Sequence, residues 1–160
     1  MMPTRRALFR LATLALLPAA ARADEPAVRV LQSWTRATPG AGRTAAIYLT
    51  LEAEGAADRL TGASSPDAAM AMLHESYTEN GVARMRMLDG VDLPAGSKVV
   101  LKPGGMHIML TGLRRTLRRG DKVEVTLTFA SAPPIKVKVP VLAANTPSPA
   151  GETMPGMNGP

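Results

Sequence analysis

The stretch 123-VEVTLTF-129 alternates strictly between apolar and polar residues, from Val123 at its start to Phe129 at its end. The stretch 135-IKVKV-139 repeats this period of two after a short connection that contains Pro133 and Pro134. Residues two apart in a β-strand point to the same face, so each stretch predicts a strand with one buried face. Together they indicate a β-protein.

Shorter stretches with strand character precede this pair, at residues 28–36, 45–51, 59–63, 69–77, 82–88, 99–101 and 106–110. Residues that favour turns, chiefly Gly, Pro, Asn and Asp, lie between them. No long segment has the 3.6-residue apolar period of a helix, and we expect at most one irregular helical turn, in the charged connection 113–119. Seven or more short strands predict an all-β, Greek-key β-sandwich. Its core should be aliphatic and include Trp34.

Residues 1–23 have the features of a secretory signal peptide. A start with three arginines precedes an uncharged apolar run at 11–21, and Ala21-Arg22-Ala23 has the small residues of a cleavage site. The run is too short for a lasting membrane span. The pair Arg5-Arg6 leaves two export routes open, the general one and the twin-arginine one.

The remaining chain divides into a β-sandwich domain at 24–142 and a tail at 143–160. The tail is rich in Met, Pro and Gly, and we expect it to be disordered because it has little apolar area to bury. Four of the 19 basic residues lie in the leader and all 13 acidic residues lie beyond it, which leaves a mature net charge of +2. Charge therefore gives little reason to expect nucleic-acid binding.

The chain has no cysteine. A thiolate zinc site and a blue-copper centre are therefore excluded, since both require thiolate ligands. The domain must also be held together without disulfides.

Both histidines of the chain lie in stretches rich in methionine. His107 and Met109, within 102-KPGGMHIML-110, are two residues apart and so share one face of the predicted strand. The Pro-Gly-Gly turn before them places the pair at the start of that strand, near a loop end of the domain. The other histidine, His74, lies in the stretch 69–77.

Asn80-Gly81, between two strand-like runs, predicts a β-hairpin with a two-residue turn. In that register His74 lies opposite Met87, and Met85 lies on the diagonal of the same face. Met72 shares the face as well. Hairpin geometry thus offers Met72, Met85 and Met87 as partners for His74 and does not choose among them.

Two neutral imidazoles with thioethers form an uncharged, soft ligand set that suits Cu(I). Zn²⁺ prefers thiolate or carboxylate, and Ca²⁺ and Mg²⁺ prefer oxygen ligands. A single strand methionine is more often core filler, and a lone histidine is more often a surface or hydrogen-bonded residue. The metal interpretation therefore depends on both histidines lying in methionine-rich strands. A metal-free β-sandwich for adhesion or scaffolding is the alternative.

The spacing H-x10-M-x21-H-x-M, formed by His74, Met85, His107 and Met109, resembles the motif of the periplasmic copper chaperones called PCuAC. Stretches similar to that family extend over roughly residues 28–141 and include 33-SWTRAT-38, 46-AIYL-49, 74-HE-75, 81-GVARMR-86, 93-LPAG-96 and 101-LKPGGMHIML-110. The resemblance implies a cupredoxin-like β-sandwich that binds one Cu(I) through those four residues. It thereby selects Met85 over Met87, and it leaves Met72, Met87 and Met106 to pack around the site.

The resemblance also implies a role, because carriers of this family supply copper for cytochrome oxidase assembly, often alongside Sco-type proteins. We therefore expect a periplasmic, monomeric copper chaperone that is not an enzyme and is not inserted in a membrane. It would pass Cu(I) to an oxidase copper domain or a Sco-type protein, since a partner's thiolate is the stronger soft ligand. Copper sequestration by the same site is an alternative. A copper oxidase is disfavoured because two histidines are too few firm ligands for Cu(II).

Two further features have alternative interpretations. The arginines of the connection 113–119 predict a solvated loop, or else a surface that docks an acidic partner or lipid headgroups; they are Arg114, Arg115, Arg118 and Arg119. Met154 and Met157 in the tail belong either to a low-complexity linker or to a weak second Cu(I) site.

Overall fold

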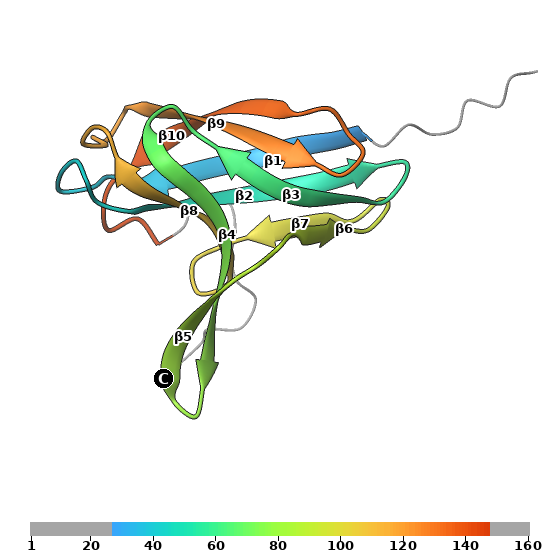
Figure 1. Ribbon diagram of the computed structural model, residues 1–160, viewed down its shortest axis with the longest axis horizontal. Coiled ribbons are helices and arrows are strands. Elements are labelled where there is room, and N and C mark those ends of the chain that lie inside the picture. Colours follow the sequence, from blue (N-terminus) through green and yellow to red (C-terminus); the bar gives the residue numbers. More distant parts are fainter. Residues whose placement is uncertain (1–26, 148–160) are drawn as a thin grey trace, which may run out of the picture.

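The computed structural model describes residues 27–147, which form a β-sandwich (Figure 1). Its strands are β1 (Ala27–Arg36), β2 (Ala45–Glu54), β3 (Asp58–Ser64), β4 (Ala68–Glu79), β5 (Val82–Met87), β6 (Val91–Leu93), β7 (Lys98–Leu101), β8 (Met106–Leu113), β9 (Lys122–Phe129) and β10 (Ile135–Leu142). The predicted leader, Met154 and Met157 lie outside the described residues. The division of the chain at residues 23 and 142 stays a prediction.

The strands form two sheets that are joined along one side. The first sheet has the order β5-β4-β8-β2-β1, with β7 also paired to β2, and the second has the order β10-β9-β3-β6. A short parallel pairing joins them where Thr35 of β1 lies beside Val141 of β10. Neighbours such as β2 and β8 are far apart in the sequence. The expected all-β sandwich is confirmed.

The core between the sheets is aliphatic, as expected, and Phe129 is the aromatic member of its buried cluster. Ile108 and Leu110 of β8 are fully buried in it. Because side chains alternate along a strand, His107 and Met109 lie on the opposite, outer face of the first sheet. The core thus fixes which way the predicted ligand pair points.

Trp34 is buried, as expected, but it does not belong to the main core cluster. It is 5% exposed and pairs directly with Tyr48, whose ring centroid is 4.5 Å from its own. The next pair along these strands, Thr35 and Ile47, includes the core residue Ile47, so Trp34 and Tyr48 lie on the outer face. Alternation alone does not tell which face of a strand is covered.

One strand was missed. Residues 91–93, which lie outside the predicted strands, form β6, which pairs with β3. The connection 113–119, for which we expected at most one irregular helical turn, contains none. Instead Leu117 is buried, and its N–H donates to Thr38 Oγ1 at 3.1 Å. Arg115 in this connection donates to Asp67 at 2.8 Å, so at least one of its arginines has a structural role.

Asp58, at the start of β3, holds the corner between β9 and β10. Its Oδ1 accepts N–H hydrogen bonds from Arg59 at 2.7 Å and Ser131 at 3.0 Å, and its Oδ2 accepts one from Ala132 at 2.8 Å. Burial acts to raise the pKa of Asp58, but these hydrogen bonds outweigh it and hold the pKa below its ordinary value. The carboxylate form is therefore the one that stabilises the fold.

Candidate metal centre

The pairing of β4 with β8 brings the two histidines together. His74 lies directly opposite His107, and Met72 lies directly opposite Met109. The two imidazole centroids are 6.1 Å apart, and the ring planes differ by 21°. All four side chains share the outer face of the first sheet, since the intervening Ile108 points into the core.

The β4–β5 hairpin adds two thioethers to this face. Its turn Asn80-Gly81 has φ values of 51° and 77°, as a two-residue type I′ turn requires. Met87 lies opposite His74, and Met85 lies opposite Ser76, so the register predicted from the sequence is confirmed.

The site has an open side and a buried side. The hairpin projects beyond the sandwich (Figure 1), and β5 is exposed along its whole length. Met85 is 49% exposed and Met87 is 68% exposed, whereas His107 on β8 is 4% exposed. Side chains on the β5 side can therefore exchange partners more easily than His107 can.

The ring nitrogens are suited to binding a metal. His107 Nδ1 lies 3.0 Å from the carbonyl oxygen of Gly105. A proton on Nδ1 is donated to that carbonyl, which leaves the lone pair of Nε2 free to bind a metal. His74 Nδ1 is buried and has no hydrogen-bond partner within residues 27–147. Buried polar atoms are normally paired, and a metal ion would satisfy this one.

An aromatic wall, formed by Trp34 and Tyr48, lies beside His107. The Tyr48 ring centroid is 6.4 Å from that of His107, and Arg36 covers both aromatic rings at 5.5 and 5.8 Å. Burial raises the pKa of the Tyr48 phenol, so the wall stays uncharged at neutral pH. Sequence patterns gave Tyr48 and Arg36 no place at the site, because only the pairing of β1, β2 and β8 brings them there.

The charged side chains of the hairpin lie on its other face. Glu75 pairs with Arg86 at 2.6 Å, and Glu79 pairs with Arg84 at 2.7 Å. Exposed ion pairs stabilise a fold only slightly. Their position nevertheless leaves an uncharged surface around Met85.

The outer face offers a soft ligand set. Within residues 27–147 no three His, Cys, Asp or Glu side chains lie close enough together to hold a metal. Two imidazoles and several thioethers do lie together, and this combination favours Cu(I) over Zn²⁺, Ca²⁺ or Mg²⁺.

None of the described residues forms a helix of the length and apolar character needed to cross a membrane.

Comparison with known proteins identifies the family. Residues 28–141 match the family described as "Putative lipoprotein LpqE-like". The chain belongs to the LpqE-like family. The protein of Leifsonia xyli subsp. xyli named "Putative lipoprotein Lxx21020" is 39% identical over 129 residues, which cover 78% of this chain and 77% of that protein.

Solved structures share the fold of this LpqE-like chain. The copper-bound PCuAC domain from PmoF2 is 26% identical, with a TM-score of 0.61 over 72% of this chain and 92% of that one. The solution structure of CuI-DR1885 from Deinococcus radiodurans is 30% identical, with a TM-score of 0.57 over 78% of this chain and 83% of that one. The resemblance to PCuAC and the cupredoxin-like sandwich that it implied are confirmed.

Proposed function

We propose that this LpqE-like protein is a periplasmic copper chaperone that binds one Cu(I) through His74, Met85, His107 and Met109. The observation that carries the proposal is the direct pairing of His74 with His107 on a sheet face that also holds Met109 and the hairpin methionines. Two imidazoles and two thioethers form an uncharged set that suits Cu(I). Similarity to a copper-bound PCuAC domain and to CuI-DR1885 supports the choice of metal.

The exposures of the ligands suggest an order of release. Met85 on the open hairpin leaves first, because its thioether is a weak ligand and is 49% exposed. His107 leaves last, because it is buried and its ring is held by the Gly105 carbonyl. All four ligands are neutral, so release of the ion from this site moves no electron and no proton; any proton lost on transfer comes from the recipient's thiols as they bind Cu(I).

The recipient we propose is a copper protein with thiolate ligands, such as an oxidase copper domain or a Sco-type protein. Thiolate binds Cu(I) more strongly than thioether, so transfer runs toward the partner. A partner can approach over the uncharged hairpin face, where a thiolate replaces Met85 and the other ligands follow one at a time. This function is that of a carrier rather than an enzyme.

A transfer experiment tests the proposal. The Cu(I)-loaded protein is mixed without oxygen with the apo form of an oxidase copper domain or of a Sco-type protein, and copper is measured in each after separation. We expect about one ion per protein before mixing and movement of that ion to at least one recipient. If the protein binds no Cu(I), or if the His107→Ala variant binds it as tightly as the unaltered protein, the assigned ligand set is wrong. Binding without transfer to either recipient would instead favour sequestration.

A further inference from the structure

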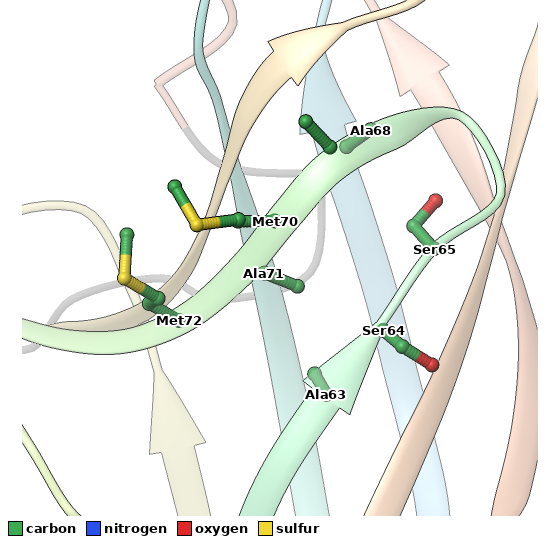
Figure 2. A pocket seen from close by; sticks show the side chains of 8 residues that line it. Ala63, Ser64, Ser65, Ala68, Met70, Ala71 and Met72 are labelled. Carbon is green, nitrogen blue, oxygen red and sulfur yellow. The ribbon is translucent and has the colours of Figure 1, made fainter.

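Further thioethers lie along the same sheet face, on the side away from the hairpin. Met70 precedes Met72 by two residues on β4, so both share the face of His74. Figure 2 shows the Met70 and Met72 side chains on one side of β4 and the Ala71 side chain on the other. Met109 lies directly opposite Met72 and on the diagonal from Met70. Such Cβ atoms are about 5 and 7 Å apart, so three flexible thioethers can reach one point.

Met70 is the accessible member of this set. It is the third residue of β4 and is 58% exposed, whereas Met72 and Met109 are half-buried. A cavity of about 320 Å³ lies beside Met70 and Met72 (Figure 2). Apart from these two, the lining residues are all Ala or Ser, so the lining has no charged group; they are Ala63, Ser64, Ser65, Ala68, Ala69 and Ala71.

A polar atom without a partner lies on the strand beside Met70. Thr111 is directly opposite Met70, and its Oγ1 is buried without a hydrogen-bond partner among residues 27–147. A hydroxyl is a neutral, weak donor group, and the cavity lining has no carboxylate. The chemistry of this corner therefore suits a soft monovalent ion and not Ca²⁺ or Mg²⁺.

We propose that Met70, Met72 and Met109 form a second, weaker Cu(I) site that loads the site of His74 and His107. This inference rests on the proposed function. Met109 belongs to both ligand sets, and alternate residues of a strand are about 7 Å apart, so the ion moves between overlapping sites. Three thioethers bind Cu(I) more weakly than a set that includes two imidazoles. The ion therefore moves from the exposed Met70 end toward the buried His107.

The loading step is balanced without another reactant. The bonds from Cu(I) to the sulfurs of Met70 and Met72 break, those to the nitrogens of His74 and His107 form, and Met109 stays bound. Copper remains Cu(I), and neutral imidazoles release no proton. The Met85 sulfur then completes the set.

The test is a titration of the full chain, labelled with ¹³C at the methionine methyl groups. The probes are Ag(I), a soft monovalent ion without redox chemistry, and anaerobic Cu(I). We expect the first equivalent to shift Met85 and Met109. With Met109 already bound to the first ion, the second equivalent should shift Met70 and Met72. In the double variant Met70→Leu/Met72→Leu the second set of shifts is lost. Affinity at the first site stays within about twofold, and loading from a chelated Cu(I) donor slows about tenfold.

Matched variants make the result specific. Met106→Leu changes a methionine on the opposite face of β8. It should alter neither the binding of the first equivalent nor that of the second, since Leu and Met have similar volumes. Met154→Leu/Met157→Leu removes the tail thioethers and should also leave the second event intact.

Three results would overturn the inference: a second equivalent that shifts Met154 and Met157 instead, no shift at Met70 and Met72, or an unchanged loading rate in the double variant. A different result would contradict the proposed function without contradicting the second site. If His107→Ala leaves the first event unaltered while Met70 and Met72 still shift, the second site stands and the assignment of the first does not.

Discussion

Separate replacement of Met85 and Met87 by Leu decides which hairpin methionine binds copper. Met87 lies directly opposite His74, whereas Met85 lies opposite Ser76 and therefore diagonal to His74. Opposed and diagonal Cβ atoms are about 5 and 7 Å apart, and a long Met side chain spans either distance. Met85 is nevertheless the less exposed of the two, at 49% against 68%, although it is nearer the tip of the hairpin. We expect Met85 to be the ligand.

The expected effect follows from the role of each side chain. Loss of a group that only supports a metal ligand commonly lowers affinity 10- to 100-fold, so loss of a ligand should reach the upper end. We expect Met85→Leu to weaken Cu(I) binding about 100-fold, or about 2.7 kcal/mol. Met87→Leu should weaken it about threefold or less, or below about 0.7 kcal/mol. Neither variant should change the free energy of unfolding by more than about 0.5 kcal/mol, because both side chains are exposed.

The assay is anaerobic competition with a chromophoric Cu(I) chelator, accompanied by thermal unfolding of each apo variant. A larger loss in Met87→Leu than in Met85→Leu would reject the assignment of Met85. A loss seen only in the double variant would reject it as well, since either methionine would then suffice.

Three further predictions concern stability and oxidation. Asp58→Asn should lower the free energy of unfolding in urea by about 2–3 kcal/mol at pH 7, because it removes one oxygen that accepts a buried N–H. The folded-state pKa of Asp58 is lowered, so the contribution of its carboxylate to stability is complete above about pH 4 and is lost as the pH falls through the folded-state pKa. The stability deficit of the variant should therefore shrink in acid, and a constant deficit would contradict this prediction. Gly112→Ala places a Cβ 2.9 Å from the Cβ of Ala69 at a φ of 64°, and it should lower the free energy of unfolding by about 2 kcal/mol in the same assay. Gly40→Ala, with open space around the new Cβ, should lower it by less than about 0.5 kcal/mol. Equal effects of the two variants would contradict this prediction. Peroxide should abolish Cu(I) binding by converting thioethers such as Met85 to sulfoxides, and undiminished affinity after full oxidation, checked by mass spectrometry, would count against thioether ligands.

Local patterns in the sequence were enough to predict much of the hairpin and the strands. The Asn80-Gly81 turn fixes the β4–β5 register, because a two-residue turn leaves one way to pair the strands that follow. Alternation in 123–129 and 135–139 identified β9 and β10, because each has one face on the core. These features depend on residues that are neighbours in the sequence.

Features that depend on the pairing of strands far apart in the sequence could not be predicted from such local patterns. His74 and His107 are brought opposite each other by the β4–β8 register, which no short turn fixes. The aromatic wall of Trp34 and Tyr48 lies at His107 for the same reason. β6 was missed because a strand of three residues between turns gives too short an alternation to recognise.

The position of β4 explains how one site can both hold an ion and release it. His74 lies between Met87 of β5 and His107 of β8, so its backbone is paired on both sides. Met85, in contrast, lies on an edge strand whose single neighbour is β4, in a part of the hairpin that projects from the sandwich. A bound ion would therefore link the projecting hairpin to the sandwich through Met85. Loss of that one bond would free the hairpin for a partner while the histidines, supported by the core, keep their positions until a stronger ligand arrives.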